Sequence, residues 1–465
     1  MRIERFSNQR INAVRAALGA VLAVSLLGAS APQVPAVPAT ATLPDGATYR
    51  IEVPTNWNGT LLLYSHGYNA PGDENPALDV DSEIVALRPT LFSRGYALAG
   101  SSYAGTGYAV EDGLRDQMAT LDEFVRRYGK PKRTIAWGHS LGGLISIGLI
   151  ERHPDRFDGA LPMCGILAGT RATWNQVLDS EFAFKVLAAP EDSTLALVHI
   201  HDPAANYQIA RRIFEAAEKT PAGRARLALA AAFNEEPGWD PSTPSRPSDR
   251  AGQLAAMLRW LENPALAFGF LFRAELEARA GGNPSGNAGE SYLDAFRKLP
   301  QRDLIVAAYK DAQLDLDADL RALDATPRIT PDAAAEAYAK ANTDAGATLP
   351  VPVLTLHTVA DGLVPVGHER NYAEAVPAAA RAANLRQLFV NRAGHCAFTS
   401  EETLVALESL EARLQTGSWP NLDPHELREA AAAYGDALGS FQNDDGHDVP
   451  SAPAFIDFIP KGFLR

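Results

Sequence analysis

Cysteine is scarce in this chain, which has 2 among 465 residues. That number excludes a disulfide-rich scaffold and a zinc site built from cysteines. Basic residues are also too few to balance the acidic ones, with 42 lysines and arginines against 56 aspartates and glutamates. The resulting formal net charge of −14 argues against nucleic acid or an anionic membrane surface as the main partner.

The composition lacks any bias that marks a disordered or fibrous protein. Hydrophobic residues make up 46% and charged residues 21% of the chain, which is typical of globular proteins. A chain of 465 residues is too long for one simple core. We therefore expect two or three domain-sized units.

The N-terminus has the pattern of a targeting segment. An apolar stretch, Ala16–Ala31, follows four basic residues, which are Arg2, Arg5, Arg10 and Arg15. The stretch is shorter than the roughly 20 residues that span a bilayer, which favours a secretory signal over an anchor. Cleavage after Ala41 is favoured, because a cut after Ala31 would place Pro32 beside it. We expect residues 1–41 to be a signal peptide and the protein to be secreted, extracellular or periplasmic, without a stable membrane anchor.

Short apolar runs alternate with helical patterns in residues 42–170 and return in residues 346–420. The expected strands are Thr60–Ser65, Tyr96–Gly100, Thr134–Gly138, Gly159–Cys164, Val351–Leu356 and Leu385–Val390. This alternation predicts parallel strands joined by helical crossovers, an α/β fold. The intervening residues 171–345 have helical spacing and are a predicted insertion. Residues 421–465 are expected to form a tail that packs on the core.

A glycine-flanked serine lies between a predicted strand and a predicted helix, in Gly138-His139-Ser140-Leu141-Gly142. This G-x-S-x-G pattern suits a turn so tight that the serine's neighbours must be glycine, which exposes its hydroxyl. Ser140 is therefore the candidate nucleophile, with Gly138, His139 and Gly142 supporting the turn. The alternative is a glycine-rich turn with a capping serine.

A serine hydroxyl needs a base to take its proton. His395 follows the last predicted strand of the core, and Asp361 follows the strand before it. Parallel strands bring their carboxyl ends to one edge of the sheet, so Ser140, Asp361 and His395 are expected to converge. His395 is the candidate general base, and Asp361 the residue that orients it.

Donors for a tetrahedral oxyanion are expected where the first strong strand ends, at Ser65-His66-Gly67-Tyr68. The backbone N–H of Tyr68 is one candidate, and that of Leu141 is the other. Gly67 permits a close approach, and His66 is a supporting residue.

These motifs together resemble the α/β-hydrolase superfamily. They are His66-Gly67-Tyr68, Gly138-His139-Ser140-Leu141-Gly142-Gly143, Asp361-Gly362-Leu363-Val364-Pro365 and Gly394-His395. The resemblance implies a mostly parallel eight-stranded sheet with a helical lid inserted after strand 6, hydrolysis through an acyl-enzyme, and no cofactor. The segment Pro54–Thr60 loosely resembles secreted esterases of the tannase and feruloyl-esterase kind.

The histidine loop must reach toward Ser140, so it is expected to pass over the end of the strand that carries Cys164. In an exported protein this predicts a disulfide between Cys164 and Cys396, the residue after His395. Two buried thiols are the alternative.

Three other segments have residue patterns that can indicate a functional site. His199-Ile200-His201-Asp202 has two histidines that would share one face of a strand, but no further clustered ligand follows, so no metal site is expected. Asn443-Asp444-Asp445-Gly446-His447-Asp448 misses the EF-hand spacing and is expected to be a solvated turn. The run Leu266–Phe272 suits either the core of the insertion or an apolar acyl pocket.

The sequence thus favours a serine hydrolase that cleaves a small-molecule or polymeric carboxylic ester without metal or cofactor. A secreted aminopeptidase with the same three residues is the main alternative. It would need an acidic residue from the insertion to hold the substrate's amine, and the candidates are Glu181, Glu191, Glu235, Glu236 and Glu275. A non-catalytic binding module is less favoured, because none of the three catalytic candidates is missing. The oligomeric state is left open.

Overall fold

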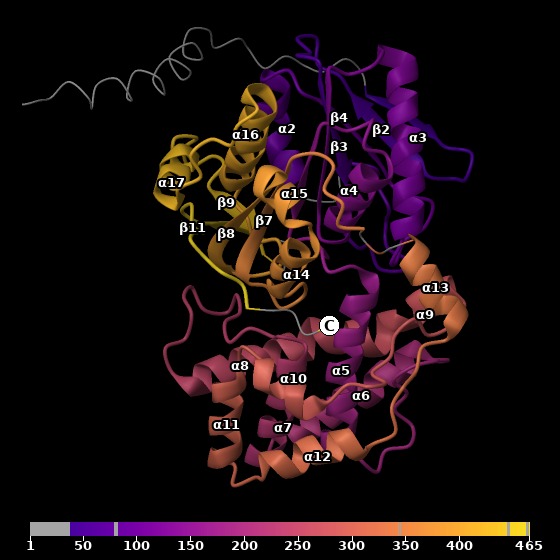
Figure 1. The fold of residues 1–465 in the computed structure, drawn as a ribbon, viewed down its shortest axis with the longest axis vertical. Coiled ribbons are helices and arrows are strands. Elements are labelled where there is room, and N and C mark those ends of the chain that lie inside the picture. The colour runs from indigo at the N-terminus through magenta and orange to yellow at the C-terminus, as the bar shows by residue number, and fades with distance from the viewer. Residues whose placement is uncertain (1–37, 79–81, 343, 345, 444–446, 462–464) are drawn as a thin grey trace, which may run out of the picture.

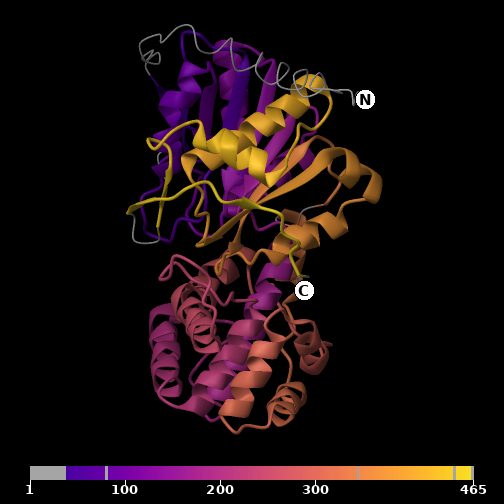
Figure 2. The same cartoon turned by 90° about the vertical axis from the view of Figure 1, so that its left-hand side faces the viewer.

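A computed structural model of the chain describes residues 38–78, 82–342, 344, 346–443, 447–461 and 465. It has two parts, an upper lobe built on a β-sheet and a lower lobe built of helices (Figures 1 and 2). The C-terminal residue lies where the two lobes meet.

The sheet is mostly parallel and has the strand order β1-β2-β4-β3-β5-β6-β7-β8-β11. Its strands are β1 (Ala39–Thr42), β2 (Thr48–Glu52), β3 (Thr60–Ser65), β4 (Ala97–Ser101), β5 (Arg133–His139), β6 (Gly159–Met163), β7 (Val353–Ala360), β8 (Leu385–Ala393) and β11 (Phe455–Ile456). The neighbours from β4 to β8 pair in parallel, while β1, β2 and β11 pair antiparallel at the two edges. The predicted α/β fold is confirmed, with nine strands where the resemblance implied eight.

Helices cover both faces of the sheet, which explains the continuous apolar runs of its central strands. One face packs against α3 (Val110–Tyr128) and α4 (Leu141–Arg152). The other face packs against α2 (Ser82–Ser93), α16 (Ser400–Thr416) and α17 (Pro424–Ala432). Successive side chains of a strand point to opposite faces, so Leu61 and Leu63 join the first core, and Leu62 and Tyr64 the second. Two short helices, α14 (Gly367–Ala375) and α15 (Ala378–Asn384), connect β7 to β8.

The helical lobe comprises the elements between β6 and β7. They are α5 (Thr170–Ala188), α6 (Pro203–Ala217), α7 (Pro221–Phe233), α8 (Arg250–Trp260), the π-helical segments η1 (Leu261–Ala265) and η2 (Phe268–Phe272), α9 (Arg273–Ala280), α10 (Tyr292–Lys298), α11 (Arg302–Asp311), α12 (Leu316–Ala325) and α13 (Ala333–Asn342). Buried residues from this lobe form a hydrophobic core of their own, to which α5 and α7 contribute most of their buried faces. The insertion is therefore a folded unit with its own interior rather than a loose excursion.

The C-terminal segment of the chain contacts both lobes. β11 pairs with β8, whereas the short hairpin of β9 (Ser440–Gln442) and β10 (Asp448–Pro450) stands apart from the main sheet. Arg465 then forms ion pairs with Asp179, at 3.0 Å between Nε and Oδ2, and with Glu290. The C-terminal tail thus contacts the core through β11 and ends on the helical lobe at Arg465.

The expected cleavage point after Ala41 falls inside β1, whose residues pair with Thr48–Ile51 of the next strand. Most of the predicted signal peptide, residues 1–37, lies outside the described residues. Among the helices that the structure describes, none combines the length and the apolar character that crossing a bilayer requires.

Candidate active site

Ser140 sits in the tight turn between β5 and α4 and has a φ of 56°. Its glycine neighbours are required by close backbone contacts. A Cβ at Gly142 would lie 1.9 Å from the carbonyl oxygen of Ser65, and one at Gly138 would lie 2.3 Å from the same atom. The strained turn is therefore held against the end of β3, and only glycine fits beside the serine.

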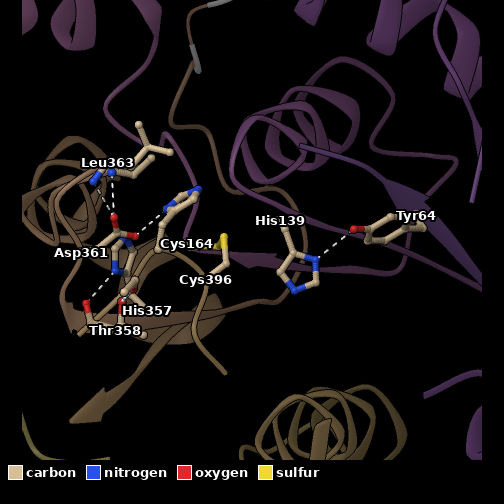
Figure 3. The surroundings of a disulfide bond; sticks show 11 residues. Tyr64, His139, Cys164, His357, Thr358, Asp361, Leu363 and Cys396 are labelled. Atoms are coloured by element: carbon tan, nitrogen blue, oxygen red, sulfur yellow. Dashed lines mark hydrogen bonds and ion pairs between the residues drawn. A yellow bond between two sulfur atoms is a disulfide. The ribbon is translucent and has the colours of Figure 1, made fainter. Parts of the chain in front are cut away.

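His395 and Asp361 come together at the carboxyl ends of β8 and β7. The Nδ1 atom of His395 lies 2.7 Å from Oδ2 of Asp361. The other carboxylate oxygen, Oδ1, accepts hydrogen bonds of 2.9 Å from the backbone N–H groups of Leu363 and Val364 (Figure 3). Asp361 is buried, and these bonds fix both of its oxygens. It can therefore hold His395 in the tautomer that carries its proton on Nδ1.

A cavity of about 400 Å³ is lined by both Ser140 and His395. The Nε2 atom of His395 is buried and has no hydrogen-bond partner within the described part of the chain. A basic nitrogen and a serine hydroxyl thus face the same space, where a substrate would lie between them.

A second, smaller cavity of about 50 Å³ also has Ser140 in its wall. Its lining is mainly apolar and includes Tyr108, Ile166, Trp174 and Val177. Ser140 lies at the boundary of the two spaces, so the larger cavity and the smaller one are suited to the two halves of a substrate.

The two expected oxyanion donors, Tyr68 and Leu141, both line the smaller cavity beside Ser140. Leu141 is the first residue of α4, where backbone N–H groups have no acceptor within the helix. Neither of these two N–H groups donates to another residue that the structure describes. The loop after β3 also approaches closely, because a Cβ at Gly67 would lie 3.4 Å from that of Ser140.

The supporting histidines hold the loops around the serine. His66 stacks on Tyr103 with 3.9 Å between ring centroids, and its ring nitrogens contact the carbonyl oxygens of Gly67 and Ser102 at 2.8 and 3.1 Å. His139 contacts the Tyr64 hydroxyl through Nδ1 at 3.1 Å. These contacts tie the end of β3 to the end of β5.

The disulfide prediction is confirmed, since Cys164 and Cys396 are joined with 5.3 Å between their Cα atoms. The bond connects the end of β6 to the loop that carries His395 (Figure 3). Cys396 lines the larger cavity. Although Cys164, His395 and Cys396 cluster, sulfur atoms shared in a disulfide offer no thiolate to a metal.

Aromatic residues of the helical lobe reach the site. Phe268 and Phe272 line the larger cavity, and their ring centroids lie 5.3 and 5.5 Å from that of Tyr68. Phe270 and Leu266 of the same run belong to the core of the helical lobe. Part of the run Leu266–Phe272 is therefore core, whereas an acyl pocket at Phe268 and Phe272 stays a prediction. Trp174, Val177 and Asn234 also line the smaller cavity, and the sequence did not predict this. Helical spacing indicates which face of a helix is buried, but it does not indicate which part of the protein packs against that face.

The acidic residues considered for an aminopeptidase are placed elsewhere. None of the five lines either cavity beside Ser140. Glu181 pairs with Arg273 at 3.2 Å, and Glu275 pairs with Arg279 at 2.7 Å. Glu191 is exposed, while Glu235 and Glu236 are buried near the turn after α7. The acid that does line the larger cavity is Asp73, from an exposed loop of the core.

The other segments singled out from the sequence lie away from this site. His199 and His201 are not on a strand, so the premise that they share a strand face is wrong. Nε2 of His199 lies 3.7 Å from Oδ2 of Asp332, and Asp202 instead caps α6. In the segment Asn443–Asp448, residues 444–446 lie outside the described residues. The backbone N–H of His447 donates to Asn443 Oδ1 at 2.8 Å, as in a turn.

Known proteins are similar to this chain over most of its length. Residues 36–260 match a family described as "Tannase-like family of unknown function (DUF6351)". The chain is 28% identical over 447 residues to o-phthalyl amidase from Xanthobacter agilis, covering 88% of this chain and 94% of the amidase. Two solved structures from Aspergillus oryzae are also similar. One is an esterase with 14% identity and a TM-score of 0.41, covering 90% of this chain and 83% of that chain. The other is feruloyl esterase B with 13% identity and a TM-score of 0.38, covering 82% and 80%.

Proposed function

We propose that the chain is a serine hydrolase of the α/β-hydrolase superfamily with Ser140 as nucleophile, which its similarity to a tannase-like family and to o-phthalyl amidase supports. The observation that carries the proposal is the pairing of His395 with Asp361, together with the cavity that Ser140 and His395 share. Nucleophile, base and orienting acid are then all present, each after a different strand.

The proposed reaction proceeds in two halves. Ser140 Oγ attacks the substrate's carbonyl carbon while Nε2 of His395 takes the hydroxyl proton. The bond to the leaving group breaks, and that group takes the proton from His395. Water, activated by His395 in turn, attacks the acyl-enzyme, and the acid product leaves with Ser140 restored. Asp361 stabilises the imidazolium in both halves.

The negative oxygen of each tetrahedral intermediate would accept hydrogen bonds from the N–H groups of Tyr68 and Leu141. A donor of this kind is worth about 10²–10³ in rate. The position of Leu141 at the start of α4 adds the positive end of the helix dipole.

A carboxylic ester is the proposed substrate, because these groups are sufficient to cleave one. The lining of the two cavities includes no lysine or arginine among the described residues, which favours an uncharged acyl group. An aromatic amide is a second candidate. It is favoured by the similarity to o-phthalyl amidase and by the aromatic side chains of Tyr108, Trp174 and Phe268 in the smaller cavity. An aminopeptidase that holds the amine with an acid of the helical lobe is disfavoured, since none of the five acids considered lines either cavity; the acid that does, Asp73, belongs to the core.

We further propose that the protein is exported, as its N-terminal pattern predicts. The Cys164–Cys396 disulfide is compatible with an oxidising compartment. N-terminal sequencing of the exported chain tests this, and finding the intact Met1 terminus on a protein retained in the cytoplasm would overturn it.

Activity is tested with p-nitrophenyl esters from acetyl to palmitoyl, beside phthalyl amides and aminoacyl p-nitroanilides. Ser140→Ala is the control for each substrate, and a fluorophosphonate probe reports directly on the nucleophile. We expect ester turnover that Ser140→Ala abolishes, and probe labelling at Ser140. Amide turnover without ester turnover would select the second candidate. Failure of every substrate together with failure of labelling would overturn the serine mechanism.

A further inference from the structure

The loop that carries His395 begins with Gly394, which has a φ of 123°. Glycine has more backbone freedom than any other residue, so its own conformation does not fix the peptide directly before the histidine. The pairing of β7 with β8 is also irregular here, because its register shifts between Thr358 and Ala360. Such a shift interrupts the regular ladder of hydrogen bonds. The position of His395 therefore depends on individual bonds to its loop.

Both backbone groups of Gly394 are bonded to β7. Its N–H donates to the carbonyl oxygen of Ala360 at 3.0 Å. Its carbonyl oxygen accepts a hydrogen bond of 2.7 Å from Oγ1 of Thr358. Within the described part of the chain, no second donor bonds to this carbonyl oxygen. A single side chain, that of Thr358, thus determines where the carbonyl group of Gly394 points.

The bond between Thr358 and Gly394 lies in the interior of the protein, where both residues are buried. A carbonyl oxygen buried away from water is unfavourable without a donor. Loss of the Thr358 hydroxyl would leave the oxygen of Gly394 in that state. We therefore expect the loop to shift toward another donor when the hydroxyl is removed.

The strand that holds this loop also leads to the acid that orients His395. Asp361 directly follows β7, and its Oδ2 lies 2.7 Å from Nδ1 of His395 (Figure 3). Thr358 thus fixes the main chain beside the histidine, while Asp361 fixes its ring. Because both bonds start from the same end of one strand, they set the position of the ring relative to the acid.

The far end of the loop is held by different residues. Cys396 is bonded to Cys164, and Nη1 of Arg392 donates to the carbonyl oxygen of Ala397 at 2.6 Å. Neither contact reaches the peptide before His395. The two ends of the loop are therefore fixed independently, and the near end depends on β7.

We propose that Thr358 is a positioning residue for the hydrolase reaction. Its hydroxyl holds the loop at Gly394 so that the ring of His395 stays aligned with both Asp361 and Ser140. This inference rests on the proposed function. Thr358 is not among the described residues that line the two cavities beside Ser140, so it acts through the main chain of the loop and not on the substrate.

Thr358→Ala and Thr358→Ser together isolate the hydroxyl, because both lose the methyl group and only serine keeps the donor. In Thr358→Ala we expect kcat for the best p-nitrophenyl ester to fall about 10–100-fold with KM unchanged, since a misplacement of about 1 Å at a reacting group has an effect of this order. Thr358→Ser should keep the parent's kcat. Thr358→Val, which has the shape of threonine without its donor, should behave like Thr358→Ala and replaces it if alanine prevents folding.

Thr355→Ala is the matched control. Thr355 is equally buried on β7, but its hydroxyl donates to Oε2 of Glu369 at 2.5 Å and not to the histidine loop. It should lose stability, as Thr358→Ala does, and keep the parent's kcat.

Proton NMR of the Nδ1–H group of His395 gives a measurement that needs no substrate. A proton in a short hydrogen bond to a carboxylate resonates downfield of the amide protons, and its loss in Asp361→Asn assigns it. We expect Thr358→Ala to shift this resonance, whereas Thr358→Ser and Thr355→Ala leave it in place.

The proposal is overturned if Thr358→Ala keeps the parent's kcat, if Thr355→Ala loses as much, or if Thr358→Ser is as slow as Thr358→Ala. An unchanged resonance in Thr358→Ala also overturns it. A parent protein that cleaves no substrate and is not labelled by the fluorophosphonate would instead overturn the proposed function. The resonance would then still decide whether Thr358 holds His395 against Asp361.

Discussion

Asp361 and His395 are hydrogen-bonded to each other but belong to the walls of two different cavities. Through Oδ2, Asp361 holds Nδ1 of His395 at 2.7 Å, and His395 faces the space that Ser140 lines. Asp361 lines a separate cavity of about 560 Å³, whose wall also includes Glu235. The loop after β7 thus contributes to the walls of both cavities, through Leu363 in the first and Asp361 in the second.

Asp361→Asn should cost on the order of 10⁴-fold in kcat for the best p-nitrophenyl ester, because an amide cannot hold His395 in the required tautomer. Asp73→Asn is the matched control, since Asp73 lines the same cavity but bonds to the backbone N–H of Ala70 at 3.2 Å rather than to His395. Equal rates in the two variants would contradict the role given to Asp361.

Gly142→Ala should destabilise the fold and remove activity. The added Cβ would meet the carbonyl oxygen of Ser65 at 1.9 Å, so either β3 or the turn at Ser140 must shift. Gly105→Ala is the control, because its Cβ would have ordinary contacts, the nearest at 3.5 Å. Thermal unfolding and fluorophosphonate labelling measure the two effects. A Gly142→Ala enzyme that unfolds and labels like the parent would contradict the described turn.

The sequence predicted the catalytic candidates because each follows a strong apolar strand. In a parallel sheet the carboxyl ends of the strands must converge, whatever the loops do. Ser140, Asp361 and His395 could therefore be grouped from residues far apart in the chain. The edge strands could not be foreseen, because β1 is four exposed or half-buried residues and β11 has two residues.

The residues that line the cavity beside Ser140 could not be predicted from the sequence, for a different reason. Trp174 and Asn234 reach the small cavity from α5 and from the end of α7. Their positions depend on how the helical lobe packs against the core, which periodicity does not encode. For the same reason the sequence offered five acids for an amine site next to Ser140, whereas Glu181 is paired with Arg273 and Glu235 lines a separate cavity.

Val177→Ala should shift the preferred acyl chain of the p-nitrophenyl ester series toward greater length. Val177 lines both the small cavity beside Ser140 and a neighbouring space of about 10 Å³ that contains Glu181 and Phe270. The substitution removes two methyl groups from the wall between these two spaces, which we expect to join them into one longer pocket. Val186→Ala, on the same helix but packed against the interior of the helical lobe, is the control. An unchanged chain-length optimum in Val177→Ala would place the acyl group elsewhere.

Loss of the disulfide should reduce both stability and turnover. Cys164 and Cys396 are 232 residues apart in sequence, and removing a native disulfide costs about 2–5 kcal/mol in small secreted domains. Because Cys396 follows His395, we expect kcat to fall more than substrate affinity in the Cys164→Ser/Cys396→Ser double variant. Denaturant unfolding and steady-state kinetics measure the two changes. A variant with the parent's kcat would show that the loop keeps its position without the bond.

Glu235→Gln should make the protein more stable at pH 8 than its parent, and equally stable near pH 4. Burial raises the folded-state pKa of Glu235 to about 8, above the ordinary carboxyl value of 4.5. The folded protein therefore holds this proton more tightly than the unfolded chain, and stability falls as the pH rises from 4.5 to 8. Glutamine cannot ionise, so the stability of the variant does not fall with pH in this way.

Each 1 kcal/mol of stability corresponds to about 2–4 °C in Tm for domains of 150–250 residues, so we expect the Tm of Glu235→Gln to exceed that of the parent by several degrees at pH 8. Asp303→Asn, which removes an exposed carboxylate, should follow the parent at both pH values. If the Tm difference between Glu235→Gln and the parent is the same at pH 4 and pH 8, the carboxyl of Glu235 is not buried as described.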